Sequence, residues 1–590
     1  MDASKIRNVA VIAHVDHGKT TLMDRLMQES GAIQKQSDES RVMDSNALEK
    51  ERGITILSKS VTLDWNGYQF NMVDTPGHAD FGGEVERILG MADAALLLVD
   101  AKEGPMPQTQ FVLTKALQKQ LPVIVIINKI DKPDQRADDV YEEVFELFMK
   151  LNATDEQLDF PMLYASAKNG WASDDIKAVG GDMKIVFQKM IDHVPAPQGD
   201  PNAPLKMLVT MIGSGPFLGR ILTGRIHQGT LKEGMALQTI TPSGEVIEQG
   251  KANKIFMNKG EKNVFVTEAS AGSIVSLSGL SEGTVSHTIA DMTCAKPLVA
   301  PVIDPPTLTM NFSVNDSPFA GRDGDKLTAR VLERRLFQEM EQNVSIKIEK
   351  SSGTGFKVAA RGELQLGILI ETMRREGFEL SISPPKVIFK KGERGKKLEP
   401  VEEVQIDLEE TYLGKIVEKV NKRFANVHDI SPLGHDRFRI TMDCPTRCLL
   451  GFNSELLMQT RGTATMYRSF KAYEDYRGEL GNLRNGPLVS TAEGKAAAHA
   501  LASIEARGIL FIRPGEEVYK GMIIGEHSRE NRLDVNPAKG KKLTNMRAAG
   551  TDTGVKLAPP NEMTLEEYLA YIKDGEKLEV TPKKIRPRIA

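Results

Sequence analysis

The first 200 residues alternate strand-length apolar runs with longer amphipathic stretches of helical period. Alternation of this kind predicts a parallel sheet with helices on both faces, and such sheets bind ligands at the carboxyl ends of their strands. We therefore expect an α/β domain whose functional residues directly follow its strands. The predicted strands are Asn8 to Ala13, Phe70 to Asp74, Ala94 to Asp100, Pro122 to Asn128 and Pro161 to Ser166.

The remaining residues have different patterns. Short alternating runs separated by turns that contain glycine fill residues 205–295, and they are typical of a β-barrel. Two later segments each predict the order βαββαβ of a ferredoxin-like, split βαβ sandwich. These α+β segments run from Thr307 to Ile382 and from Val401 to Phe470.

Proline clusters separate these patterns, because proline continues neither a helix nor a central strand. Joints are predicted at Pro195–Pro204, at Pro297–Pro306, around Pro384–Lys397 and, more weakly, at Gly478–Pro487. A chain of 590 residues is also too long for one core. The prediction is a multidomain protein with an α/β domain at 1–200, a β-barrel at 201–303, ferredoxin-like domains at 304–390 and 398–480, and a distinct mixed C-terminal domain at 481–590.

Composition excludes several classes of protein. With 40% hydrophobic and 26% charged residues, the chain lies within the range of globular proteins and outside the disordered and collagenous classes. Three cysteines are too few for a disulfide framework, which favours the reducing cytoplasm. The apolar runs fall short of the roughly 20 residues that a membrane helix needs. We expect a cytoplasmic protein without a membrane segment.

The formal net charge of -4 is unevenly distributed along the chain. Residues 1–200 contain 21 basic and 32 acidic residues, a balance of -11, whereas residues 201–590 contain 55 and 48, a balance of +7. The near-neutral total therefore does not argue against a polyanionic partner for the second part.

A phosphate-binding pattern follows the first predicted strand. Residues Ala13 to Thr20 read AHVDHGKT, which is G-x-x-x-x-G-K-[ST] with alanine at the first glycine. Backbone N–H groups and the following helix terminus can hold phosphates there, Lys19 can reach them, and the hydroxyl of Thr20 can bind Mg²⁺. The alternative is a Gly-Lys turn that caps an ordinary helix.

Further motifs follow the next strands. Asp74 begins DTPG, where its carboxylate can hold Mg²⁺ through water and Gly77 can approach a γ-phosphate. The sequence NKID begins at Asn128 and provides an aspartate that can accept hydrogen bonds from guanine, while SAK begins at Ser166. Each motif is weak alone, but together they predict a GTP/GDP site. Its residues are Asp16, His17, Gly18, Lys19, Thr20, Thr21, Gly77, Asn128, Lys129, Ile130, Asp131, Ser166, Ala167 and Lys168.

The segments AHVDHGKTT, RGITI, DTPGH, NKID and SAK resemble the guanine-nucleotide motifs of the translational GTPases, whose elongation factor G branch also carries alanine at position 13. The resemblance implies that residues 1–200 form the GTPase domain. It assigns Thr55 to Mg²⁺, with Thr20 and Asp74, and assigns His78 to orienting the attacking water. Val15 and Ile54 would form a hydrophobic gate, and Asp16 would help to hold a monovalent cation. Otherwise, Thr55 only begins a strand and His78 lies in an exposed loop.

Later segments resemble other domains of this family. Phe217–Met235 is similar to its second domain, and Ala360–Gly377 and Gly451–Met466 are similar to the third and fifth domains of elongation factor G. Only the short basic linker Lys390–Glu399 separates the last two, so the domain that translocases insert there is missing. The run Lys583–Arg588 is interpreted as a basic tail.

The segment NPAKGKKLTNMRAAGTD resembles the C-terminal domain of the BipA (TypA) family, and the likeness to that family spans nearly the whole chain. It implies that 481–590 binds RNA, although a solvated charged loop is the alternative from composition. Basic and amide side chains can follow a phosphate backbone. The predicted RNA-binding residues are Lys539, Lys541, Lys542, Asn545 and Arg547.

The resemblance implies a monomeric, ribosome-dependent GTPase. It would bind both ribosomal subunits, rRNA and A-site tRNA at the translation-factor site, and act in 50S subunit assembly and in translation under stress or low temperature. Two alternatives stay open: an elongation-factor-like translocase, and a ribosome-binding scaffold that GTP switches and in which hydrolysis is incidental.

Overall fold

The computed structural model describes residues 3–14, 16–33, 47–52, 55, 58–76, 81–178, 180–215, 217–260, 262–301, 305–343, 345–351, 353, 355–434, 436–481, 484–540 and 557–590. The chain divides into two compact units. One unit contains Met1–Asp304 with Glu341–Ser345, and the other contains Pro305–Met340 with Ile346–Ala590. None of the helices in these residues has the length and apolar character needed to cross a bilayer.

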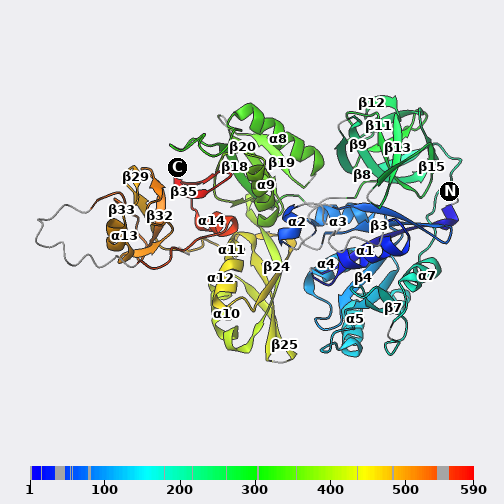
Figure 1. The fold of residues 1–590 in the computed structure, drawn as a ribbon, viewed down its shortest axis with the longest axis horizontal. Coiled ribbons are helices and arrows are strands. Elements are labelled where there is room, and N and C mark those ends of the chain that lie inside the picture. The colour runs from blue at the N-terminus through cyan, green and yellow to red at the C-terminus, as the bar shows by residue number, and fades with distance from the viewer. Residues whose placement is uncertain are drawn as a thin grey trace, which may run out of the picture. The chain divides into compact units, whose positions relative to one another are not determined.

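The N-terminal part of the first unit is built on a mostly parallel sheet (Figure 1). Strands β3, β1, β4, β5 and β6 are parallel and agree with the five predicted strands, whereas β2 and β7 are antiparallel additions that the sequence analysis did not predict. In spatial order the strands are β2 (Ser60–Trp65), β3 (Tyr68–Asp74), β1 (Ile6–Ala13), β4 (Ala94–Asp100), β5 (Val123–Asn128), β6 (Met162–Ser166) and β7 (Trp171–Ser173).

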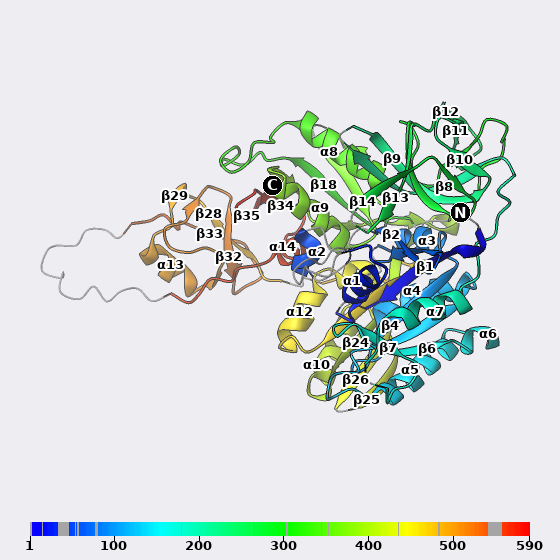
Figure 2. The same ribbon diagram turned by 45° about the vertical axis from the view of Figure 1, so that its right-hand side comes forward.

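Helices cover both faces of this sheet, as predicted. On β1, Val9 and Val11 pack with α1 (Lys19–Glu29) and α7 (Lys184–His193), and Figure 2 shows α1 beside β1. Ala10 and Ile12 face the opposite core. Alternate side chains of a strand point to opposite faces, so both faces of β1 are buried. The second core includes helices α3 (Gly82–Leu89), α4 (Pro107–Gln118) and α5 (Ala137–Lys150); the shorter η1 (Ala3–Lys5), α2 (Ala47–Arg52) and α6 (Asp155–Leu158) complete this part.

An antiparallel system of strands follows in the same unit, with a core of its own. Strand β9 pairs with β8 and β16, and β11 pairs with β12 and β17. The many short antiparallel strands agree with the predicted all-β character, and closure into a barrel stays a prediction. The strands are β8 (Lys206–Gly215), β9 (Gly219–Gln228), β10 (Thr230–Lys232), β11 (Ala236–Ile240), β12 (Val246–Lys251), β13 (Lys254–Lys259), β14 (Lys262–Val266), β15 (Glu268–Ser270), β16 (Ile274–Ser278) and β17 (Thr288–Asp291).

The second unit begins with the first predicted βαββαβ segment. Its strands lie in the order β19-β20-β18-β21, which places the first and last strands of the segment side by side. Strand β22 (Lys386–Val387) also pairs with β18. The elements are β18 (Leu308–Val314), α8 (Ala329–Gln342), β19 (Lys347–Lys350), β20 (Phe356–Ala360), α9 (Glu363–Arg375) and β21 (Leu380–Ile382).

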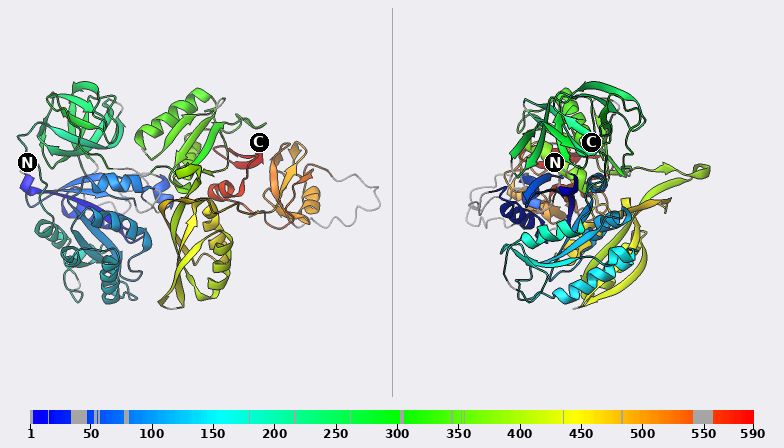
Figure 3. Two further views of the ribbon diagram at one scale, coloured as in Figure 1. Left: turned by 180° about the vertical axis from the view of Figure 1, so that it is seen from behind. Right: turned by 90° about the vertical axis from the view of Figure 1, so that its right-hand side faces the viewer.

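The second βαββαβ segment has the equivalent order, β27-β24-β26-β25, with helices against the sheet (Figure 3, yellow). Its first strand begins at Lys397 and pairs with β23 (Lys390–Lys391), and η3 (Glu393–Gly395) lies between them. The predicted basic linker is therefore part of the sheet. The elements are β24 (Lys397–Glu409), α10 (Glu410–Lys422), β25 (Asn426–Gly434), β26 (Arg437–Pro445), α11 (Thr446–Leu449), α12 (Phe452–Gln459) and β27 (Thr465–Asp475).

The C-terminal part contains a smaller sheet in the order β30-β32-β28-β33. Strands β29 and β31 pair separately, and Phe319, from the loop after β18, lies in the core beneath this sheet. The elements are β28 (Pro487–Ser490), β29 (Gly494–Lys495), α13 (Ala498–Glu505), β30 (Gly508–Leu510), β31 (Glu517–Val518), β32 (Ile523–His527) and β33 (Leu533–Val535).

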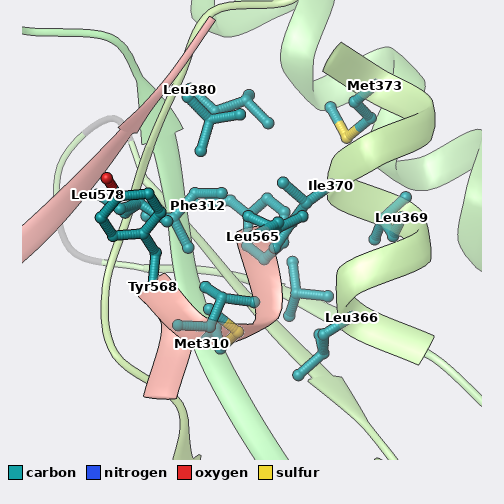
Figure 4. Close-up of a cluster of buried hydrophobic side chains, with 14 of the residues drawn as sticks. Met310, Phe312, Leu366, Leu369, Ile370, Met373, Leu380, Leu565, Tyr568 and Leu578 are labelled. Atoms are coloured by element: carbon teal, nitrogen blue, oxygen red, sulfur yellow. The ribbon is translucent and has the colours of Figure 1, made fainter. Parts of the chain in front are cut away.

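The last residues return to the first βαββαβ segment. Strand β34 (Glu576–Val580) pairs with β21 and with β35 (Ile585–Ile589), and α14 (Leu565–Tyr571) enters the same core. Figure 4 shows Leu565, Tyr568 and Leu578 beside Phe312 and Ile370. The last residues of the predicted C-terminal domain, α14 to β35, therefore share a core and a sheet with the first βαββαβ segment, and the boundary at 481 stays a prediction.

The interpretation of Lys583–Arg588 as a basic tail is wrong. Arg586 pairs with the fully buried carboxylate of Glu579 at 2.8 Å, and Arg588 is buried and pairs with Asp316. Charged side chains that find such partners can lie within a fold, and both arginines belong to the strand β35 (Ile585–Ile589).

Candidate functional site

The phosphate-binding pattern forms the connection between β1 and α1. Asp16 and Gly18 have φ values of +63° and +95°, and α1 begins directly afterwards at Lys19. Residues in such conformations, next to a helix N-terminus, present backbone N–H groups to an anion. A Cβ atom at Gly18 would lie 2.5 Å from Nδ2 of Asn128, so only glycine fits. The backbone at this end of the sheet therefore suits a phosphate ligand.

Lys19 and Asp74 meet at the same edge of the sheet. Their Nζ and Oδ1 atoms lie 2.7 Å apart, and the two side chains are only 10% and 4% exposed. Lys19 also donates to the carbonyl of Thr75 at 2.7 Å, while the Thr75 hydroxyl donates to the carbonyl of Val11 at 2.6 Å. Strand β3 thus brings a buried carboxylate to the phosphate loop. This carboxylate and the half-buried Thr20 hydroxyl are hard oxygen donors, which fit Mg²⁺.

Asn128 connects three of the predicted motifs. Its Nδ2 donates to the carbonyl of His17 at 2.9 Å, and its Oδ1 accepts from the N–H of Ala167 at 2.9 Å. Lys129, at a φ of +64°, donates to the carbonyl of Asp16 at 2.5 Å. The ends of β1, β5 and β6 are consequently held together by side chain to backbone bonds, as their shared position in the parallel sheet predicts.

Arg25 is a supporting residue that the sequence analysis did not identify. It lies on α1, and its guanidinium donates to the carbonyls of Ala167 at 3.2 Å and Lys168 at 2.7 Å. It therefore ties the turn after β6 to the phosphate-loop helix. A long basic side chain on an amphipathic helix carries no sequence signal for this role.

Functional residues at the end of β4 and in the loop after it were also missed. Asp100 is 1% exposed, and its Oδ2 lies 2.7 Å from Nζ of Lys129. Burial raises the pKa of Asp100, but the Lys129 hydrogen bond and the Lys102 N–H outweigh it and leave the pKa below its usual value. His17 is fully buried, with Nε2 3.4 Å from a carboxylate oxygen of Glu103. The feature of the sequence that could have identified Asp100 is its position as a carboxylate at the carboxyl end of a buried strand.

Some of the remaining predicted residues lie in the described ranges, and the others lie outside them. Thr55 is half-buried, whereas Thr21, Asp131, Lys168 and Lys539 are exposed and Ser166 is buried. Within the described ranges, no group of three or more His, Cys, Asp or Glu side chains forms a metal centre. Outside those ranges lie Val15, Ile54, Gly77, His78, Lys541, Lys542, Asn545 and Arg547.

Three family models match successive parts of the chain. Residues 4–197 match the elongation factor Tu GTP binding domain, 396–483 match the elongation factor G C-terminus, and 485–590 match the TypA/BipA C-terminal domain. The first match covers the sheet and the site described above, and the third covers the C-terminal elements from β28 to β35.

Relatives align over almost the whole chain. A protein of Escherichia coli strain K12, named large ribosomal subunit assembly factor BipA, is 48% identical over 587 residues, which cover 99% of this chain and 96% of that protein. The chain belongs to the BipA family. Family members of the same name from Haemophilus influenzae and from Synechocystis are each 46% identical, over 100% and 99% of this chain and over 96% and 98% of their own lengths.

A solved structure shares the fold at low sequence identity. The protein ttk003000868 from Thermus thermophilus matches with a TM-score of 0.56 and 16% identity, over 80% of this chain and 98% of that one. The BipA-family chain therefore shares its fold with this protein over most of its length.

Proposed function

We propose that this chain is a GTPase that acts on the ribosome in assembly of the large subunit. The observation that carries the nucleotide part is the meeting of the phosphate loop, Asp74, Asn128 and the Ala167 turn at one end of the parallel sheet. The ribosomal part is supported by the name of the curated family members, large ribosomal subunit assembly factor.

The phosphate groups of GTP are assigned to the backbone of the loop before α1 and to Nζ of Lys19. The Thr20 hydroxyl, the Asp74 carboxylate and Thr55 would hold Mg²⁺, which neutralises developing charge on phosphate oxygens when it is bound. Phosphoryl transfer depends on positioning more than on covalent chemistry. Orientation of the attacking water is assigned to His78, and shielding of that water to Val15 and Ile54.

The base is assigned to the ends of β5 and β6. The exposed carboxylate of Asp131 can accept from N1–H and the amino group of guanine, and adenine lacks this pair of donors. The stem of Lys129 can cover one face of the base, while Asn128 holds the surrounding loops together. The proposed ligand is therefore GTP or GDP.

Ribosome binding is assigned to the basic later part of the chain, with RNA phosphates contacted by Lys539, Lys541, Lys542, Asn545 and Arg547. We further propose contacts with both subunits and with A-site tRNA, a monomeric state, a cytoplasmic location and action under stress or low temperature. A translocase is disfavoured, because β23 and β24 form one hairpin where translocases carry an inserted domain.

Hydrolysis assays with the full chain test the nucleotide and ribosomal assignments together. Phosphate release from GTP is measured alone, with 50S particles and with 70S ribosomes, and compared with release from ATP. We expect stimulation with GTP only. Lys19→Ala should lose nucleotide binding, whereas His78→Ala should keep binding and lose stimulated hydrolysis. Equal turnover of ATP, or tight nucleotide binding by Lys19→Ala, would overturn the assignment.

A further inference from the structure

The loop that follows β4 holds the carboxylate of Asp100 in one place. Oδ1 accepts from the N–H groups of Lys102 at 2.7 Å and Glu103 at 3.4 Å, and Asp100 forms an antiparallel bridge with Gly104. Asp100 is only 1% exposed, so its carboxylate is almost completely shielded from solvent. A carboxylate satisfied by its own loop on one oxygen can present the other in a fixed direction.

That second oxygen contacts Lys129. The Asp100 Oδ2 atom lies 2.7 Å from Nζ of Lys129, and the same Nζ donates to the carbonyl of Asp16 at 2.5 Å. Lys132 is a more distant cation, at 4.0 Å. The ammonium of Lys129 therefore bridges the end of β4 to the phosphate loop, and Asp100 supplies the charge that holds it there.

The same loop contacts the phosphate loop at a second point through His17. Glu103 lies 3.4 Å from Nε2 of this buried imidazole, and the N–H of Asp100 lies 3.3 Å from Nδ1. The same Nδ1 also lies 3.4 Å from the carbonyl of Leu98, the residue two positions before Asp100 on β4. The end of β4 and the loop after it therefore contact the phosphate loop through both ring nitrogens of His17.

We propose that Asp100 is a positioning residue for guanine nucleotide binding, acting through Lys129. The carboxylate orients the stem of Lys129 for contact with the base and holds the ammonium of Lys129 at the carbonyl of Asp16. The distance between the base subsite and the phosphate subsite is thereby kept constant. The inference rests on the proposed nucleotide function. In this role Asp100 contacts neither the nucleotide nor the attacking water, so the affinities for GDP and for GTP should depend on it equally.

The test is equilibrium titration of the full chain with fluorescent GDP and GTP. Asp100→Asn, which removes the charge and keeps the shape, should raise Kd for both by about tenfold or more, since it leaves the half-buried ammonium of Lys129 without its anionic partner. The kcat of ribosome-stimulated hydrolysis at saturating GTP should stay unchanged while KM rises. Asp134→Asn is the matched control, because Asp134 forms an exposed ion pair with Lys102 beside the same loop at 2.6 Å.

A double-variant cycle separates positioning from general structure. The double variant Asp100→Asn with Lys129→Met should bind GDP no more weakly than Lys129→Met alone; additive losses would overturn action through Lys129. Asp100→Glu keeps the charge and should bind GDP more tightly than Asp100→Asn, even if the latter is less stable to heat. Wild-type affinity in Asp100→Asn overturns the inference and leaves the proposed function intact, whereas a wild-type chain that binds no GDP overturns the function itself.

Discussion

Gly18 lies where the phosphate loop passes beneath the side chain of Asn128, and its replacement by alanine tests that packing. A Cβ atom there would lie 2.5 Å from Nδ2 of Asn128, far closer than van der Waals contact. The amide must move, and it then loses its bonds to the His17 carbonyl and the Ala167 N–H, each 2.9 Å long. Gly18→Ala therefore perturbs the loop, the end of β5 and the turn after β6 together.

The magnitude follows from two contributions. A side chain at a φ of +95° costs about 1–2 kcal/mol, which is conformational strain alone. Displacing Asn128 leaves buried polar groups without their bonds, at about 1–3 kcal/mol. The second contribution acts at the binding site. A central value of about 2 kcal/mol corresponds to a rise in the Kd of GDP of about 30-fold.

Gly67→Ala is the matched control. Gly67 has a φ of +78°, and nothing lies within 4 Å of a Cβ atom there, so the substitution introduces strain without a clash. Gly67→Ala should lose about 1–2 kcal/mol of unfolding free energy in urea through this strain. Gly18→Ala should lose this amount and, in addition, the cost of the broken Asn128 bonds, and only Gly18→Ala should lose affinity in a titration with fluorescent GDP. Equal GDP affinity in the two variants would refute the packing of Gly18 against Asn128.

Three further predictions concern stability. Arg225→Ala leaves the half-buried carboxylate of Asp93, which Asn8 still contacts, without its ionic partner at 2.8 Å. It should lower the unfolding free energy by about 3 kcal/mol in urea titrations; a loss below about 1 kcal/mol would contradict this. Leu578→Ala should cost about 2–5 kcal/mol, because Leu578 is fully buried in the core of the first βαββαβ segment; a melting temperature equal to wild type would argue against that packing. Burial lowers the pKa of His227 to about 4, so the unfolded chain binds more protons between pH 4 and 6.5 and stability falls as pH decreases through that window. His227→Gln should remove this contribution to the pH dependence, and an unchanged pH profile would contradict it.

The nucleotide-binding part of the fold was largely predictable from the sequence. The five parallel strands follow from apolar runs such as Ala94–Asp100, since strands buried on both faces carry continuous hydrophobic residues. The strands β2 and β7 are short or one-sided, and they carry a weaker signal. The βαββαβ segments were predictable because the spacing of their apolar residues changes between the period of a strand and that of a helix at each element.

Contacts distant in sequence were not predictable. The run Lys583–Arg588 reads as a basic tail, because nothing local shows that Asp316 neutralises Arg588 or that β21 has an open edge for β34. Asp100 was likewise read only as the last residue of a strand. Its partner Lys129 directly follows the neighbouring strand β5, so the pair becomes visible only when the sheet brings the strand ends together.

Phosphate release from GTP by the full chain, measured with and without purified 50S particles, tests the central claim most directly. The account predicts hydrolysis that is slow alone, is stimulated by ribosomal particles and is lost in Lys19→Ala. Hydrolysis that no ribosomal particle stimulates, from a chain that still binds GTP, would contradict it.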